Sequence, residues 1–452
     1  MENTEKNSLD VTRMPRIINA MKFAYFAYFF SVGCIHNFYP VLLKKITIPN
    51  SKIGILSSIG MVGGTISPIM VGYLADKTKR SRLILIVITV LTIVFHTIPI
   101  SVISIKIMID RSKVDSASGS GSLSLSFIYL LYIFQFFVTF GDQGFKALMD
   151  SVSHKVIGEC NKAGMQCDFA RLRMFGGVGI GLATVSSGFL MDWFKKVMPY
   201  GLPEEIILVV ICASMGFVLI IVLIVNVPHV ETKEQVSFLD TIKQILTRVD
   251  GLVCFFSQFL IQFALNITRN FDAIYIQHLG GNKSWTGLCT FVGYVADVLM
   301  MYLSPTISHA FASREATIAF GSCIAVIRTL FYGYADSKYM AMNNYILHGF
   351  SMGLIIPTMS SLVKSKAPER LISSYVSLLT ATGKIGGSIA SLVGGIISEK
   401  YSYTMIFVIS SIFFAMSGLL IVLFEYFFGK KKAPEKSPGY KMIVNAGQEE
   451  KQ

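Results

Sequence analysis

The stretch that decides the fold is Gly72-Tyr-Leu-Ala-Asp-Lys-Thr-Lys-Arg-Ser-Arg82, a short loop with four basic residues between two long apolar runs. The runs cover residues 52–76 and 82–106. Each is long enough for an α-helix to cross a hydrocarbon core about 30 Å thick. Lys and Arg accumulate in the short cytoplasmic loops of membrane proteins. The stretch therefore predicts two membrane helices joined by a cytoplasmic loop.

Similar apolar runs occur along the whole chain of 452 residues. We place spans at residues 16–43, 52–76, 82–106, 125–152, 168–194, 203–227, 251–279, 285–307, 315–335, 339–364, 371–399 and 402–429. Six spans, a charged loop at 228–250 and six more spans is the layout of transporters built from two related halves. We therefore predict an all-α membrane protein with two six-helix bundles, at 16–227 and 251–429.

The composition agrees with a membrane protein. Apolar residues make up 53% of the chain and charged residues only 15%, whereas about 25% of a soluble domain is charged. The net charge of +13 does not indicate nucleic acid, because the basic residues are spread over short loops and a tail. When basic residues at the ends of the spans are counted with the nearer side, we find 22 Lys and Arg on the inner side and 11 on the outer side. This bias predicts that the tails, 1–15 and 430–452, are both cytoplasmic, in a plasma or an organelle membrane.

The basic loop resembles the signature of the major facilitator superfamily, Gly-x-Leu-x-Asp-Arg/Lys-x-x-Arg-x-Arg/Lys. Gly72 permits close helix packing, and Asp76 can cap or pair with a neighbouring helix end. Lys77, Arg80 and Arg82 can hold the loop at an anionic inner leaflet. The resemblance implies that these residues form a conformational latch, which closes in the outward-open state.

Ionisable side chains inside the spans are the strongest functional signal, because a charge at the bilayer centre costs at least a few kcal/mol. They are Asp142, Lys146, Asp150, Arg171, Arg173, Arg269, Asp272, Asp297, Arg328, His348 and Lys384. Acids and bases stand on different helices, which indicates interhelical pairs around a central cavity. His96 is isolated near the outer end of the third span, and we expect it at the membrane interface.

The stretch Phe169-Ala-Arg-Leu-Arg-Met-Phe-Gly-Gly-Val-Gly179 is similar to Phe-Gly-Arg-Ala-Arg-Met-Phe-Gly-Cys-Val-Gly of the lactose permease. The chain thus resembles the branch of oligosaccharide:proton and nucleoside:proton symporters. The resemblance implies that Arg173 contacts the substrate and that Asp150 is its partner.

The second half resembles the same branch, because Arg328, His348 and Lys384 follow one another at intervals of 20 and 36 residues, as in that family. The resemblance implies that Asp297 is the acid needed for both substrate and proton, and that Asp272 pairs with Lys384. The implied substrate-binding set is Asp150, Arg173, Asp297, Arg328 and His348. The implied charge network for proton coupling is Asp272, Asp297, Arg328, His348 and Lys384.

Three positions depart from the branch. Ile180 stands where the family has the tryptophan that stacks on a galactoside, and that loss removes an aromatic platform for a sugar. Ser351 replaces the acid that releases the proton, and Tyr345 replaces a lysine. Sugar and nucleoside substrates, and coupled and uncoupled transport, therefore all stay open.

We expect a secondary-active transporter that moves a small polar solute, a sugar or a nucleoside, by alternating access, with proton symport as the coupled form. The alternatives are an uncoupled facilitator and a non-transporting membrane receptor with a carrier fold; a peptide or an organic anion is a less expected substrate. No nucleophile with a base, phosphate-binding glycine loop or metal-ligand cluster stands at usable spacing. We expect no catalytic residue, no metal, no cofactor and no nucleic-acid partner, and a monomer in the bilayer.

Overall fold

The structure is a computed structural model in which residues 14–78, 80–114, 125–165, 167, 169–198, 205–226, 249–311, 313–366 and 372–428 are described. Most of both predicted tails and of the predicted central loop, residues 1–13, 227–248 and 429–452, lies outside the described residues.

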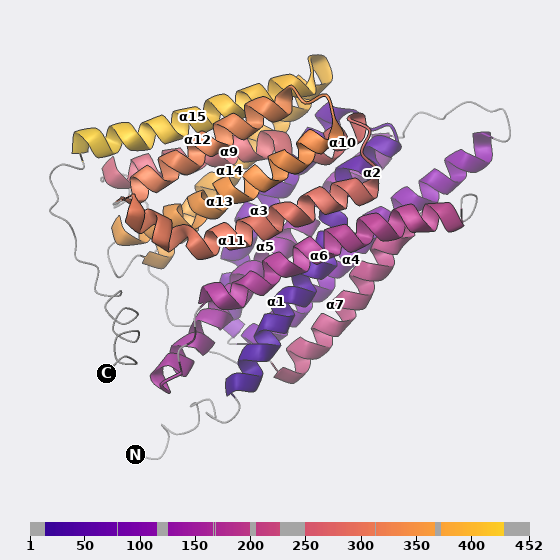
Figure 1. Ribbon diagram of the computed structural model, residues 1–452. Coiled ribbons are helices and arrows are strands. Elements are labelled where there is room, and N and C mark those ends of the chain that lie inside the picture. The colour runs from indigo at the N-terminus through magenta and orange to yellow at the C-terminus, as the bar shows by residue number, and fades with distance from the viewer. Residues whose placement is uncertain are drawn as a thin grey trace, which may run out of the picture.

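The described part of the chain is helical throughout (Figure 1). Its helices are α1 (Met14–His36), α2 (Tyr39–Lys45), α3 (Asn50–Thr78), α4 (Ser81–Val114), α5 (Leu125–Lys162), α6 (Phe169–Val197), α7 (Ile206–Asn226), α9 (Val249–Arg269), α10 (Asp272–His278), α11 (Lys283–Ala310), α12 (Arg314–Gly333), α13 (Lys338–Lys366), α14 (Ile372–Lys400) and α15 (Tyr403–Phe428).

Eleven segments of the described chain are long and apolar enough to cross a membrane, with α1 and α2 forming one of them and α9 and α10 another. The twelfth crossing is α5, a helix of 38 residues whose apolar character is interrupted by Asp142, Lys146 and Asp150. The prediction of an all-α membrane protein with twelve crossings is confirmed. Helices α4 and α5 extend well beyond the expected 82–106 and 125–152, because their ends are polar and left no apolar signal.

The first and seventh crossings are interrupted at equivalent points. Helix α1 ends just before Asn37-Phe38, and α9 ends just before Asn270-Phe271. Both phenylalanines precede a short helix and are buried, at 1% and 0% exposure. Pro40 lies in the first turn of α2, where its missing N–H is not needed. The repeated Asn-Phe pair shows that the two halves share one structural plan.

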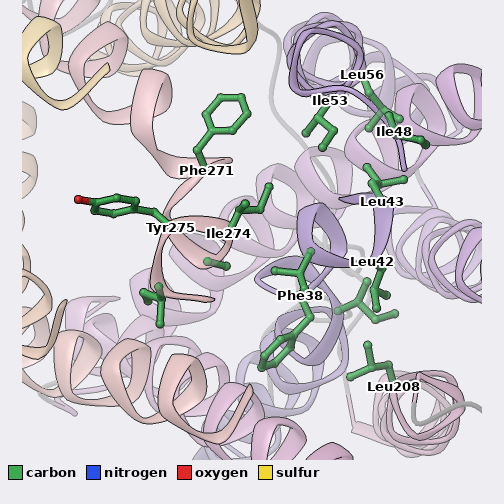
Figure 2. Close-up of a cluster of buried hydrophobic side chains, with 14 of the residues drawn as sticks. Phe38, Leu42, Leu43, Ile48, Ile53, Leu56, Leu208, Phe271, Ile274 and Tyr275 are labelled. Carbon is green, nitrogen blue, oxygen red and sulfur yellow. The ribbon is translucent and has the colours of Figure 1, made fainter. Parts of the chain in front are cut away.

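The hydrophobic core joins the halves at one end only. One cluster combines residues of the first half, such as Phe38 and Leu42, with residues of the second, such as Phe271 and Ile274 (Figure 2). The other two clusters belong to one half each. We call the joined end, where α2 and α10 lie, the closed end; the opposite end, where α1 begins and α15 finishes, is the open end (Figure 1).

Two matching acid contacts join the halves at the closed end. Glu399, in the last turn of α14, accepts a hydrogen bond from the backbone N–H of Ser51 at the start of α3, at 2.7 Å. Asp192 of α6 accepts one from the backbone N–H of Ser284 at the start of α11, at 2.8 Å. A carboxylate at a helix N-terminus satisfies a free N–H and interacts favourably with the helix dipole. Each contact therefore holds a helix of one half against a helix of the other.

Small residues let α3 and α14 approach closely behind one of these contacts. A Cβ added at Gly395 would lie 2.7 Å from the carbonyl oxygen of Asn50, so a larger side chain would push the helices apart. Further toward the middle of the membrane, the hydroxyls of Ser58 and Ser388 are 2.7 Å apart. The contact between the two halves thus extends from the closed end to about the depth of Ser388.

The loop between α3 and α4 lies at the open end. The Lys77 ammonium lies 5.8 Å from the centre of the Tyr73 ring on its own helix, and Arg80 is exposed. The Asp76 side chain and Lys79 are outside the described residues. The predicted latch residues are therefore at the end where the two cores are separate.

Candidate functional site

The first charged cluster joins α5, α6 and α1. The Arg173 guanidinium lies 3.5 Å from the Asp150 carboxylate. Tyr25 donates a hydrogen bond to the same carboxylate at 2.6 Å and lies 3.1 Å from the Ser153 hydroxyl. Arg173 is 52% exposed and Asp150 24%, so a solute can reach the pair. The two residues expected to bind substrate in the first half are thus in contact, with Tyr25 as a third member.

A second cluster lies on the same face of α5. Tyr28 donates a hydrogen bond to Asp142 at 2.7 Å, and His96 Nε2 is 3.7 Å from the other carboxylate oxygen. His96 is only 3% exposed, so its predicted place at the membrane interface is wrong. Helix α4 continues to Val114, which puts His96 near its middle and not near its end.

In the second half, Arg328 is buried between helices. Its guanidinium donates a hydrogen bond to the Asn344 side chain at 3.0 Å and lies 5.7 Å from the Phe414 ring centre. Asp272, at the start of α10, is close enough to act on it electrostatically. One Asp272 oxygen is buried without a hydrogen-bond partner among the described residues. Arg328 is therefore the main counter-charge of Asp272.

The predicted pairing of Asp272 with Lys384 is not seen. No ion pair within 4.0 Å joins them in the part of the chain that the structure describes. The break after Arg269 turns Asp272 toward Arg328, and the charges that act on Lys384 are those of Lys146, Arg269 and Asp142. Lys384 therefore belongs to the space between the halves.

Asp297 and His348 lie on neighbouring helices, α11 and α13. These helices cross closely, since a Cβ at Gly349 would lie 2.5 Å from the Asp297 backbone nitrogen. One Asp297 carboxylate oxygen is buried with no hydrogen-bond partner in the described chain. The charges that act on His348 are those of Arg328 and Arg269. Asp297 is thus a half-buried acid with one enclosed oxygen and no ion-pair partner within 4.0 Å among the described residues.

Four basic side chains face the space between the halves: Lys146 of α5, Arg269 of α9, Lys384 of α14 and His36 of α1. Arg269 and His36 meet across the halves, 3.3 Å apart. His36 and Arg269 are exposed, and Lys146 and Lys384 are half-buried. Accessible basic side chains of both halves thus approach one another between the two bundles.

Sequence reasoning named Lys146 only among the ionisable residues expected around a central cavity, without a specific role, and assigned no role to Tyr25 or Tyr28. A signal for each was present. The two tyrosines are three residues apart on one helix, and Lys146 stands four residues after Asp142 and four before Asp150. Residues three or four apart share a face of a helix, so both sets could have been placed toward the cavity.

Twelve crossings in two related halves, with charged side chains facing the space between them, define a membrane transporter of the major facilitator fold. The chain belongs to the MFS_1 like family, whose model matches residues 18–409.

Relatives and solved structures agree with this assignment. The chain is 22% identical to the uncharacterized transporter YwbF of Bacillus subtilis over 62% of its length and 66% of the relative's. It is 22% identical to the maltose permease of Geobacillus stearothermophilus over 57% of its length and 62% of the relative's. The matched stretch thus spans less than two thirds of either relative.

Solved structures match more of the chain. A point mutant of the nucleoside transporter NupG has a TM-score of 0.72 and 13% identity, covering 90% of this chain and 99% of that one. A bacterial homologue of the human lysosomal transporter Spinster, inward-facing, has a TM-score of 0.68 and 14% identity, covering 94% and 99%. At these identities the likeness concerns the fold.

Proposed function

We propose that this protein carries a small polar solute, a sugar or a nucleoside, across a membrane by alternating access, coupled to protons. The observation that supports this most strongly is the asymmetry of the core. The halves share one hydrophobic cluster at the closed end and have separate clusters at the open end. Between them lie charged side chains that solvent reaches. A solute site open to one side is what a rocking carrier presents in one of its two states.

The proposal gives each charged group a role. Asp150 and Arg173 hydrogen-bond solute hydroxyls, because a carboxylate accepts and a guanidinium donates. Asp297 carries the coupling proton, because one oxygen of its carboxyl is enclosed without a hydrogen-bond partner among the described residues and an enclosed polar atom without a partner is costly. Arg328 and His348 complete the substrate site in the second half. Both termini are cytoplasmic in this proposal, so the structure is the inward-open state.

The roles of the relatives support the solute class. One relative is a maltose permease, and one of the similar structures is a nucleoside transporter.

In this proposal the latch residues act in the opposite state, when the cytoplasmic ends of the two halves meet. The units that move are the bundles at 16–227 and 251–429, joined by the loop at 228–250, with tails at 1–15 and 430–452.

The test is uptake of radiolabelled sugars and nucleosides into proteoliposomes, with and without an imposed proton gradient. We expect gradient-driven accumulation in the wild type. In Asp297→Asn we expect accumulation to be lost while exchange of solute across the membrane continues, because exchange needs no proton release. Asp336→Asn is the matched control, since Asp336 is an exposed acid in the loop after α12. It should accumulate solute normally.

Other outcomes identify the alternatives. A solute that equilibrates but is never driven uphill by the gradient, in wild type and variant alike, makes the protein an uncoupled facilitator. Failure to move any solute, from correctly inserted protein that still binds one, favours a receptor with a carrier fold.

A further inference from the structure

We propose that the central site selects an organic anion: a small polar solute that carries a carboxylate or a phosphate group. The groups that would bind this charge are Lys146, Arg269 and Lys384, which three different helices bring to the space between the halves. This inference rests on the proposed transport function and specifies its substrate class.

The cations stand just beneath the closed end. Arg269 is the last residue of α9 and meets His36, the last residue of α1, at 3.3 Å. Lys146 of α5 lies 5.3 Å from the centre of the Phe29 ring of α1. His36 lies close enough to feel the charges of both Arg269 and Lys146. Arg269 and His36 therefore meet at the ends of the two interrupted helices, and Lys146 approaches α1 about two turns before its end.

Lys384 approaches the same space from α14. It stands one helical turn before Ser388, on the side of the open end, and Ser388 is bonded to Ser58 at 2.7 Å. Lys384 is thus immediately below the contact that closes the α3 and α14 interface. Lys146 and Arg269 are the cations that act on it, so it shares their space although it comes from a different helix.

The nearby acids of the first half are already engaged. Asp142 accepts a hydrogen bond from Tyr28 at 2.7 Å and has His96 at 3.7 Å. Asp150 is paired with Arg173 at 3.5 Å. Asp142 acts on both lysines of the cluster, and Asp150 acts on Lys146 as well, so the carboxylates that face these cations are both already engaged by other groups.

The acids of the second half do not restore the balance. Asp272 is shared between Arg328, which acts on it most strongly, and Arg269. Asp297 is not among the charges that act on Lys146 or Lys384. Within the described ranges, neither lysine of the cluster nor Arg269 has a carboxylate partner within 4.0 Å. The space between the halves therefore holds more positive than negative charge.

Like charges that face one another in a partly desolvated space repel strongly. An anion between them would remove this repulsion, and two ammonium groups with a guanidinium offer the donors that carboxylate and phosphate oxygens prefer. A neutral sugar or nucleoside needs hydroxyl and carbonyl partners but no excess charge. The cluster is therefore better explained by an anionic group on the solute than by a neutral solute.

The experiment compares matched solutes that differ in charge: glucose with glucuronate and glucose 6-phosphate, and uridine with uridine monophosphate. Binding to purified protein is measured by ligand-induced thermal shift and transport by uptake into proteoliposomes. We expect the anionic members to bind and be transported. Lys146→Gln and Lys384→Gln should each weaken that binding by about tenfold or more. Lys384→Arg should retain it, and the exposed Lys195→Gln should not change it.

The binding and transport measurements together separate the proposed anion site from the proposed transport function. Anions that bind in a lysine-dependent way but are not transported would support the anion site and contradict the transport function. Transport of glucose or uridine that is insensitive to anions and to both glutamine variants would overturn the anion site and leave the transport function standing. Absence of any anion binding to folded wild-type protein would also overturn it. Glucuronate against glucose 6-phosphate distinguishes carboxylate from phosphate as the recognised group.

Discussion

At the scale of single residues, Tyr25 is the third member of the Asp150 and Arg173 pair that we propose binds the substrate. Its hydroxyl donates to Asp150 at 2.6 Å and is buried, whereas Arg173 is half exposed. Tyr25→Phe removes this donor and frees the carboxylate to turn away from Arg173. A hydrogen bond to a charged group contributes about 1.5–3 kcal/mol. We therefore expect substrate binding to weaken by about tenfold, measured as KM for uptake.

The control for this prediction is Tyr302→Phe, because Tyr302 is 79% exposed on α11. It removes a hydroxyl from the protein surface and should leave KM unchanged. An unchanged KM in Tyr25→Phe, with normal protein yield, would show that Asp150 does not need Tyr25 to hold the substrate.

The contacts of a site residue could be predicted from the sequence where the residue lies in or near a recognisable motif. Arg173 lies inside a recognisable stretch and Asp150 a short distance before it, so their contact followed. Asp272 was assigned to Lys384 by resemblance alone, and the break after Arg269 aims it elsewhere. Lys146 was visible as a charge in a span, but its neighbours come from helices far away in the sequence, and those contacts form only in the folded protein.

At the scale of helices, the closed end depends on two acids that meet helix N-termini. Asp192 also accepts a hydrogen bond from the Ser284 hydroxyl at 2.5 Å. Glu399 accepts its hydrogen bond from the backbone N–H of Ser51. Each charge at a helix N-terminus contributes about 0.3–1 kcal/mol, more when partly buried. The double variant Asp192→Asn and Glu399→Gln should therefore shift the protein toward opening of this end, by roughly tenfold in population.

Distances between spin labels at Lys52 of α3 and Tyr401 after α14 report this shift. We expect a longer-distance population to appear in the double variant. Asp336→Asn is again the comparison, because it removes an exposed acid near the same end that has no hydrogen bond to the other half among the described residues. An unchanged distance distribution in the double variant would mean that the apolar cluster alone keeps the end closed.

The twelve helices were predictable because apolar runs of membrane length leave a clear signal. The residues at which these helices end were harder to predict. Residues 107–114 of α4 and 153–162 of α5 are helical but polar enough to read as loops. The breaks at Asn37 and Asn270 lie within apolar runs, where the pattern alone shows a continuous helix. Only the repeated Asn-Phe pair marks these two breaks in the sequence, and the repeat is recognised only when the two halves are compared.

At the scale of the whole molecule, the symmetry of the halves explains why one end is closed. The acid contacts, the interrupted helices and the Arg269 contact with His36 all occur at this end, in related positions on the two halves. In the proposed transport cycle, all of these contacts are lost in the opposite state, in which the open end closes at the loop between α3 and α4. A carrier that alternates must therefore break and remake the closed-end contacts in each cycle.

The contact between Ser58 and Ser388 allows this cycle to be stopped reversibly. Their hydroxyl oxygens are 2.7 Å apart, so a Ser58→Cys and Ser388→Cys pair is close enough for a disulfide between the halves. Oxidation should abolish transport by holding the closed end shut, and a reducing agent should restore it. Each single cysteine variant should transport normally under both conditions, which excludes an effect of the native cysteines. Transport at the full rate by protein shown to be fully cross-linked would mean that solute crosses without separation of α3 from α14, and alternating access at this end would be wrong.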